Sequence, residues 1–270
     1  MVPSTVLTTL NQLNQLPEGM VVVSGASRGI GRELVNVLLA SEIEVVALSR
    51  QACKPVENLT ALSVDLSDVK GLSIAIEMLK TVIDGRPVAG LVNAAGAVKP
   101  LGALIHQSTS DLQQSLCLMA VAPVQLAAGI SPQMPTGGRI LNLSSRSANA
   151  TFPGLGAYCM SKHALHSVTE SLRQDLSPAI GVAELIPGEV DTGMQADLRE
   201  PDPAEFTLAS FFRGNRANLI PAAVAAQFCF WVLTQTTTEA FNRSEPWFIY
   251  DRTDQPRWLP EGVEFPYTEP

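Results

Sequence analysis

The chain has 270 residues, 46% of them hydrophobic and 16% charged, a composition that supports a buried core and excludes a disordered protein. The formal net charge of -8 and the pI of about 4.9 argue against the clustered positive charge that a nucleic-acid partner needs. The cysteines, at positions 53, 117, 159 and 229, have neither metal-ligand nor redox-pair spacing and indicate reduced thiols in a cytoplasmic protein.

In chain order, the first segment is polar, and we interpret residues 1–18 as an N-terminal extension with one short helix over Leu7, Leu10 and Leu13. It lacks a basic stretch followed by an apolar core, so we expect no signal peptide. Short apolar runs then predict strands at 20–24, 44–49, 62–64, 88–93, 139–144, 182–186 and 247–250. Segments with helical spacing alternate with them, at 30–40, 69–83, 111–130, 157–176 and 221–235.

This alternation is typical of βαβ units, and it predicts the fold class. We expect a single-domain, doubly wound, Rossmann-type α/β fold, with a parallel sheet of about seven strands and helices on both faces. No linker interrupts residues 19–251, which we therefore assign to one domain. The weaker pattern over 194–220 predicts a substrate lid, and the Pro-rich tail, 252–270, is expected to be irregular.

The helical segment 112–130 carries no charged side chain. Its glutamines and its proline argue against a membrane span, and a helix that is apolar on every side is buried. We therefore expect part of it to pack against another subunit in a homo-dimer or homo-tetramer. Packing within the monomer is the alternative.

A glycine-rich turn, Gly25-Ala26-Ser27-Arg28-Gly29-Ile30-Gly31, directly follows the first predicted strand and opens a helix. Glycines at such a turn let the backbone approach a pyrophosphate, which binds at the helix N-terminus. The spacing differs from the commoner dinucleotide spacing, and an ordinary βα turn is the alternative. Its position after the first strand favours a dinucleotide site.

A second motif places Tyr158 and Lys162 four residues apart, and therefore on one face of a predicted helix. An ammonium beside a phenol favours the phenolate and lowers the phenol pKa, which makes the tyrosine a usable proton donor. Ser145 follows the strand expected at 139–144, where a parallel sheet directs side chains into its ligand crevice. These three residues are the candidate catalytic groups.

Together, these motifs resemble the short-chain dehydrogenase/reductase family over about residues 19–195. The resemblance implies that Ser145 binds the substrate carbonyl oxygen, that Tyr158 delivers the proton, and that Lys162 holds the nicotinamide ribose. Ser144 is the less favoured of the two neighbouring serines on spacing. The resemblance also implies a nicotinamide cofactor held by Gly25, Ser27, Arg28, Gly29, Ile30, Gly31, Arg50, Asp65, Leu66, Asn93, Ala94, Gly96, Tyr158, Lys162, Pro187, Gly188, Val190 and Thr192.

The residues after the second strand predict NADP(H) rather than NAD(H). An NAD enzyme of this architecture has an acidic group there for the ribose 2′-hydroxyl, but this chain has Ser49 followed by Arg50. Arg28 in the glycine-rich turn can reach the same place. Two guanidiniums suit a phosphate dianion through paired, charge-assisted hydrogen bonds. Two solvated arginines are the alternative.

One catalytic position departs from the family pattern, because Met119 stands where the family usually has an asparagine. Pro123, four residues on, has no N–H that could bond the Met119 carbonyl. We therefore predict that this carbonyl holds a water that takes part in the family's proton relay beside Lys162.

Two further segments resemble the sepiapterin reductase and benzil reductase branch: residues 190–199, and the pair Tyr250-Asp251. The sepiapterin enzymes anchor the pterin with an acidic residue at the place of Phe248, so the apolar residue here argues against a pterin. Bulky apolar walls predict an apolar ketone or vicinal diketone as substrate. The expected walls are Phe152, Leu155 and Met194, together with Phe206, Phe211 or Phe212 and with Trp247 or Phe248.

We therefore expect an NADP(H)-dependent carbonyl reductase acting on a small molecule, with no nucleic-acid or membrane partner. A ketoacyl-thioester reductase is one alternative, although acidic neighbours dilute its expected basic patch at Arg199, Arg213 and Arg216. A non-catalytic NADP-binding regulatory protein is another, supported by Met119 alone. The histidines lack ligand partners at suitable spacing, so no metal is expected.

Overall fold

The computed structural model describes residues 15–51, 53–54, 56–259, 261 and 264–269, so the helix predicted over Leu7, Leu10 and Leu13 lies outside the described residues. A parallel sheet occupies the centre, with strand order β3-β2-β1-β4-β5-β6-β9, and the predicted seven-stranded α/β architecture is confirmed. The strands are β1 (Met20–Ser24), β2 (Val45–Ser49), β3 (Leu59–Ser63), β4 (Val88–Asn93), β5 (Gly138–Leu143), β6 (Ile180–Ile186) and β9 (Trp247–Phe248).

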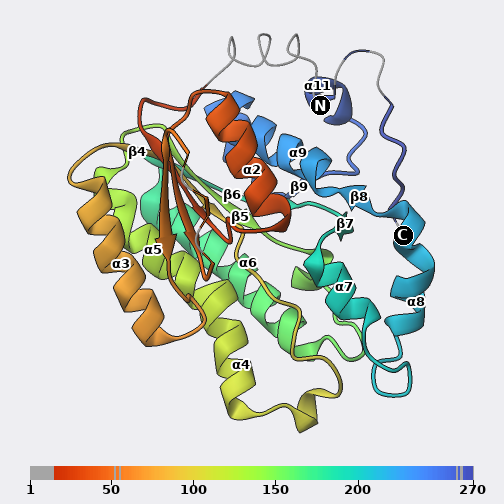
Figure 1. Cartoon of the computed structure of the whole chain (residues 1–270). Helices are drawn as coiled ribbons and strands as arrows, with labels where there is room; N and C mark the ends of the chain where they lie inside the picture. Colours follow the sequence, from red (N-terminus) through yellow and green to blue (C-terminus); the bar gives the residue numbers. More distant parts are fainter. Residues whose placement is uncertain (1–14, 52, 55, 260, 262–263, 270) are drawn as a thin grey trace.

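Helices cover both faces of the sheet (Figure 1). One layer contains α2 (Gly29–Ala40), α9 (Ala222–Gln235), α10 (Thr238–Phe241) and α11 (Gln255–Trp258). The other contains α3 (Val69–Ile83), α4 (Thr109–Leu116), α5 (Ala122–Ile130) and α6 (Gly156–Leu176). A π-helical turn, η3 (Cys117–Val121), joins α4 to α5, and short 3₁₀ turns are η2 (Leu104–His106), η4 (Ser131–Gln133) and η5 (Arg146–Ala148). Because both faces are covered, the central strands are buried along their length and mostly apolar.

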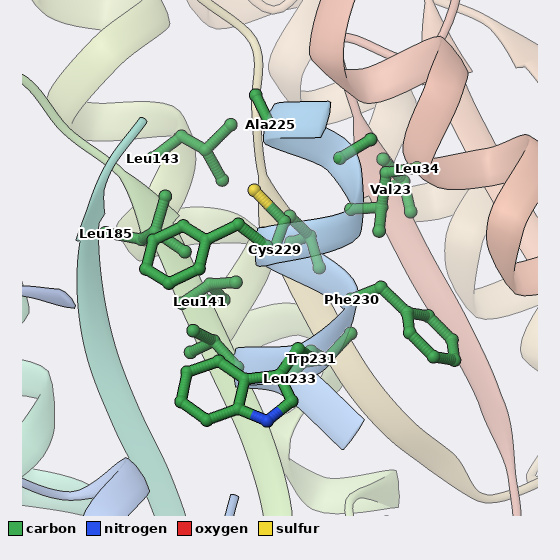
Figure 2. Packing of buried hydrophobic residues seen from close by; sticks show 14 of the residues in the cluster. Val23, Leu34, Leu141, Leu143, Leu185, Ala225, Cys229, Phe230, Trp231 and Leu233 are labelled. Atoms are coloured by element: carbon green, nitrogen blue, oxygen red, sulfur yellow. The ribbon is translucent and has the colours of Figure 1, made fainter. Parts of the chain in front are cut away.

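The core on the α2 and α9 side shows why α9 is apolar on nearly every face. Its Cys229, Trp231 and Leu233 belong to the same buried cluster as Leu141 of β5 and Leu185 of β6 (Figure 2). The helix is therefore packed between the sheet, α2 and the C-terminal segment, and no polar face remains to be solvated.

The strand order reverses between β1 and β4, because the chain first runs outward to β3 and then returns to the other side of β1. In open α/β sheets, ligands bind in the crevice that this reversal leaves at the carboxyl ends of the strands. The glycine-rich turn after β1 and the segment after β4 both lie at this crevice.

The predicted lid has more regular structure than expected. It contains α7 (Gly193–Arg199), α8 (Ala209–Gly214) and η6 (Asn215–Asn218), between the short paired strands β7 (Val190–Asp191) and β8 (Ile220–Pro221). The Arg213 guanidinium donates to the backbone carbonyls of Arg199 and Pro201, at 3.0 and 2.7 Å, and so fastens α8 to the end of α7. Phe206 and Phe212, both within this segment, stack against each other.

The C-terminal tail is also more ordered than its proline content suggested. It forms α11, and the Phe265 ring then packs 5.7 Å from Trp258 and 5.9 Å from Tyr250. Glu269 forms an ion pair with Arg146 at 2.8 Å, so the tail returns to the edge of the crevice. Apolar contacts made by these spaced aromatic residues explain the order.

Among the described residues, the continuous helix Thr109–Gln133 is long and apolar enough to cross a membrane by length and composition. Half of its most apolar window is buried inside the fold, where it packs against α3 and α6, as a core helix does. The described residues contain no cluster that could hold a metal ion.

The cysteines are free. Cys117, Cys159 and Cys229 are buried, whereas Cys53 is partly exposed after β2, with its sulfur 3.8 Å from the Ala26 carbonyl of the glycine-rich turn.

Candidate active site

A cavity of about 1260 Å3 opens at the carboxyl ends of the strands, at the point where the strand order reverses. All but one of the residues predicted to bind the cofactor line it. The lining residues of that set are Gly25, Ser27, Arg28, Gly29, Ile30, Gly31, Arg50, Asp65, Leu66, Ala94, Gly96, Tyr158, Lys162, Pro187, Gly188, Val190 and Thr192. The structure therefore brings together residues that are up to 167 positions apart, from Gly25 to Thr192.

The glycine-rich turn is held against the neighbouring strands. The Gly25 N–H donates to the Leu48 carbonyl at 2.9 Å, with φ at +72°, and a Cβ here would lie 2.7 Å from the Ala95 backbone. A Cβ on Gly31 would collide with the Gly25 carbonyl oxygen. Only glycine fits both places, so the turn can present its backbone and the start of α2 to a phosphate group.

Ser49, Arg28 and Arg50 are all among the residues that line the cavity. The Ser49 hydroxyl donates to the Gln51 carbonyl at 2.5 Å, so an uncharged side chain stands where an NAD enzyme of this architecture has its acid. The Arg28 guanidinium lies over Gly193, at the far side of the crevice. Both arginines are thus available to an anionic group.

Asp65 is the acidic residue predicted to meet the adenine. Burial opposes its ionisation, but hydrogen bonds from Ser67 and the charge of Arg50 together lower its pKa below the ordinary value. Its Oδ1 accepts the Ser67 N–H at 2.9 Å, which fixes the carboxylate in the segment after β3.

Asn93 is the predicted cofactor residue that does not line the cavity. Its side chain is buried, and its amide nitrogen donates to Asn142 Oδ1 at 2.8 Å. Asn142 in turn donates to the Thr169 hydroxyl of α6 at 2.9 Å. The asparagine ties β4 to β5 and α6 behind the crevice, and a direct cofactor contact by Asn93 stays a prediction.

The candidate catalytic groups meet in the same crevice. Ser145 follows β5, and Tyr158 and Lys162 stand on successive turns of α6, where Ser145 is hydrogen-bonded to the Tyr158 phenol. The Ser145 hydroxyl also accepts the Ser147 N–H at 3.1 Å, which orients it. Ser144 is buried and its hydroxyl has no hydrogen-bond partner among the described residues.

Lys162 is 5% exposed, and its Nζ donates to the Leu143 carbonyl at 2.8 Å while lying 5.7 Å from the centre of the Tyr158 ring. Burial lowers the pKa of Lys162 to about 8, and the Glu184 carboxylate opposes that shift. Burial raises the pKa of Tyr158 to about 12, although the bond to Ser145 lowers it. The expectation that the lysine would lower the phenol pKa is therefore wrong for this structure, because desolvation is the larger effect.

Met119 is buried on η3, where its sulfur would lie 3.7 Å from a Cβ added at Gly96. The π-helical turn leaves Ala122 N–H bonded to the Cys117 carbonyl, and Pro123 contributes no N–H. The side chain is a thioether, so any polar function at this position belongs to the backbone.

The substrate side of the cavity has the expected apolar walls. Phe152, Leu155, Met194, Phe211, Phe212 and Phe248 line it. Of the alternatives, Phe206 is buried within the lid beside Phe212, and Trp247 is buried against Trp231.

Arg146 and Glu189 are among the charged residues of the cavity wall that the sequence did not predict as site residues. Burial raises the pKa of Glu189, against a hydrogen bond from Asn215 and the charge of Arg146. Their positions, immediately after Ser145 and after Pro187-Gly188, could have indicated both.

The doubly wound sheet brings the glycine-rich turn, Ser145, Tyr158 and Lys162 into one crevice, at the point where the strand order reverses. This arrangement is that of a nicotinamide-dependent oxidoreductase. The chain belongs to the short chain dehydrogenase family, whose model matches residues 19–203.

Three relatives illustrate the range of the family. A benzil reductase that forms (S)-benzoin, from Bacillus subtilis, is 29% identical over 72% of this chain and 84% of its own length. The protein FixR of Bradyrhizobium diazoefficiens is 32% identical over 71% and 72%, respectively. The ketoacyl reductase HetN of a Nostoc species is 27% identical over 68% of each chain.

Solved structures agree on the fold. A short chain dehydrogenase/reductase from Saccharomyces cerevisiae superposes with a TM-score of 0.80 at 22% identity, covering 90% of this chain and all of its own. A Burkholderia cenocepacia enzyme in complex with NADP gives 0.69 at 24% identity, over 87% and 98% of the two chains. A 4-hydroxyisoleucine dehydrogenase with NADH gives 0.68 at 20%, over 86% and 96%.

Proposed function

We propose that this protein reduces a ketone or vicinal diketone to an alcohol with NADPH, and that Tyr158 is the proton donor. The observation that carries the proposal is the meeting of Ser145, Tyr158 and Lys162 at the crevice that the glycine-rich turn also lines. A protein that only bound a dinucleotide would not need this set.

Each side chain is suited to one step. A bound nicotinamide supplies the hydride. The Ser145 hydroxyl is oriented by the Ser147 N–H, and its hydrogen, which bonds the Tyr158 phenol in this structure, can turn to the carbonyl oxygen of a substrate. Tyr158 is in its neutral, donating form at physiological pH, since burial raises its pKa to about 12. Lys162 is mostly charged at pH 7, with a pKa of about 8, and stabilises the phenolate as the proton leaves.

The preference for NADPH is supported by the charges of the cavity lining. Arg28 and Arg50 both line the cavity, and Ser49 adds no negative charge. A 2′-phosphate would gain charge-assisted hydrogen bonds that a 2′-hydroxyl cannot match. Structures of this fold hold either nicotinamide cofactor, so the preference rests on these residues.

The substrate class is supported by the apolar walls of the cavity and by the benzil reductase relative. Phe152, Phe211 and Phe248 offer aromatic surface to a substrate of similar character. Phe248 also leaves no carboxylate at the place where the sepiapterin branch anchors a pterin.

The test is a steady-state assay of cofactor oxidation by the purified protein. NADPH and NADH are compared with an aromatic diketone, sepiapterin, a ketosteroid and a ketoacyl-thioester as substrates. We expect the highest kcat/KM for NADPH with the diketone. Equal efficiency with both cofactors would refute the NADPH preference, and preference for sepiapterin would refute the apolar-substrate reading. If none of the carbonyl compounds is reduced, a protein that binds the cofactor without catalysing a reaction is favoured.

A ketoacyl-thioester reductase is a second candidate, favoured by the similarity to the Nostoc ketoacyl reductase. The geometry around the lid argues against it. Arg213 is already bonded to two backbone carbonyls, which weakens the basic surface that an acyl carrier would dock on. The thioester arm of the same assay decides between the two.

A further inference from the structure

Gln195 of α7 is a buried amide in the cavity wall, and the proposed reaction assigns no role to it. The residue lines the cavity and is 6% exposed. Its Oε1 is enclosed and has no hydrogen-bond partner among the described residues, and none of those residues accepts a bond from its amide nitrogen. An amide that leaves water without gaining a hydrogen bond lowers stability, so its burial in this wall indicates that it serves a ligand.

The position of Gln195 along α7 places it on the substrate side of the cavity. At the N-cap of this helix, the Thr192 methyl lies 3.1 Å from the position of a Cβ added at Gly29 of the glycine-rich turn. Further along, Leu198 belongs to a buried cluster against which Tyr158 also packs. Gln195 and Leu198 are the buried residues of α7 and, three positions apart, they share one face of the helix. Gln195 therefore lies on the face that α7 turns toward the catalytic tyrosine.

The wall around this amide is otherwise apolar. Met194, which precedes it, has its methyl 3.8 Å from the position of a Cβ added at Gly96, and Phe152 and Phe212 line the same cavity. In such a pocket the apolar walls supply affinity, and a single polar group fixes the orientation of the ligand. An uncharged amide suits an uncharged ligand group, and its N–H groups donate to a carbonyl oxygen.

We propose that Gln195 is a specificity-determining residue that donates a hydrogen bond to the second, unreduced carbonyl oxygen of a vicinal dicarbonyl substrate. The inference rests on the proposed carbonyl reduction, and it narrows the substrate class to ketones that carry a second carbonyl beside the first. Ser145 and Tyr158 serve the carbonyl that is reduced, so the second oxygen needs a donor from another element. A ketone with one carbonyl leaves the amide unpaired in an apolar wall and is disfavoured for that reason.

Other polar groups of the cavity wall are less suited to this role. The Ser144 hydroxyl is also enclosed and has no partner among the described residues, but it directly precedes Ser145 and so accompanies the catalytic groups. The Arg146 guanidinium pairs with Glu269 at 2.8 Å. Gln195 comes from the lid segment instead, and it offers a neutral donor to the part of the substrate that Ser145 does not hold.

The first experiment compares kcat/KM for benzil and for deoxybenzoin, in which a methylene replaces one of the two carbonyls. Gln195→Met keeps the length of the side chain and removes its hydrogen bonds. We expect the ratio of kcat/KM for benzil to that for deoxybenzoin to fall about tenfold in this variant, because only benzil loses a hydrogen bond. Comparing the ratio between proteins cancels the different intrinsic reactivities of the two ketones. Gln113→Met, at an exposed site on α4, is the matched control and should leave the ratio unchanged, as an unaffected ratio in Gln195→Met would overturn the proposal.

The second experiment measures binding without turnover. In the complex with NADP⁺, which cannot donate a hydride, calorimetry gives the Kd of each ketone. The Kd for benzil should rise about tenfold in Gln195→Met, with the Kd values for deoxybenzoin and for NADPH unchanged. Weaker NADPH binding would show that the amide serves the cofactor and would overturn the proposal, as would an unchanged Kd for benzil. A wild type that binds benzil but reduces no carbonyl would refute the proposed function separately.

The third experiment separates a ligand-binding amide from a structural one. Replacing an unpaired buried amide by an apolar group of similar shape should leave the urea unfolding midpoint unchanged or raise it. A lower midpoint in Gln195→Met would show that the amide is bonded within the protein, against the proposal. A crystal structure of the wild type with NADP⁺ and benzil does not depend on the variant. It should show the Gln195 amide nitrogen within hydrogen-bonding distance of the carbonyl oxygen that does not meet Ser145, and any other partner for that oxygen would overturn the assignment.

Discussion

Replacing Tyr158 by Phe separates the chemical role of the phenol from its structural role. The hydroxyl makes one hydrogen bond, to Ser145, while the ring packs in the cluster formed by Val98, Leu155 and the lid. Losing one such bond costs about 1 kcal/mol of unfolding free energy. Losing a general acid costs on the order of a hundredfold to ten-thousandfold in rate, which corresponds to about 2.7 to 5.4 kcal/mol of activation free energy.

The variant should therefore fold and bind NADPH almost as the wild type does, but turn over at least about a hundredfold more slowly. Denaturant unfolding measures the first quantity, quenching of protein fluorescence measures cofactor affinity, and cofactor oxidation with a diketone measures kcat. Turnover within about tenfold of the wild type would show that the phenol is not the proton donor. A matching loss of cofactor affinity would instead indicate that the ring positions the nicotinamide.

Three other perturbations test separate parts of the structure. Arg50→Ala should raise KM for NADPH by about tenfold and leave KM for NADH unchanged, whereas Arg32→Ala on the outer surface of α2 should change neither. If Arg50→Ala and the wild type have equal KM values for NADPH, the phosphate contact is contradicted. Arg139→Met removes a buried guanidinium that donates to two carbonyls and a hydroxyl. Urea unfolding should therefore show a loss of about 3 kcal/mol in the free energy of unfolding, with kcat per folded molecule unchanged. A loss below about 1 kcal/mol would be inconsistent with a structural role for these bonds. A high-resolution crystal structure should show a water on the Met119 carbonyl, because Pro123 has no N–H to offer it. In the π-helical pattern of η3 the competing donor is the Val124 N–H, and a bond from it to the Met119 oxygen would exclude the water.

The strands were predictable where burial on both faces forces a continuous apolar run. The predicted bounds of the first strand, 20–24, are the observed bounds of β1, because all five of its side chains are buried. The predicted bounds of β3, 62–64, differ from the observed Leu59–Ser63, because β3 is an edge strand whose first residues are only partly buried and form no strongly apolar run. The prolines of the C-terminal tail predict an irregular segment. The tail is ordered instead by aromatic contacts with α9 and Tyr250, and these depend on tertiary packing that no local sequence pattern reveals.

The candidate site also has parts that the sequence predicts and parts that only the folded structure reveals. The glycine-rich turn and the Tyr158 and Lys162 pair are local in sequence, so spacing alone indicated them. Gln195 directly follows an expected wall residue, but only the packing of α7 on the body buries its amide oxygen without a partner among the described residues. The Tyr158 pKa could not be predicted from its neighbour because burial is a property of the folded chain.

The unequal burial of the four thiols has a practical use. Burial raises the pKa of Cys117, and raises that of Cys229 to about 12, so both resist alkylation in the folded protein, and Cys159 is equally shielded from solvent. A maleimide dye will therefore attach at Cys53 alone, without any engineered substitution. Because that sulfur lies 3.8 Å from the Ala26 carbonyl of the glycine-rich turn, we expect the emission of the dye to change when a cofactor binds against that turn.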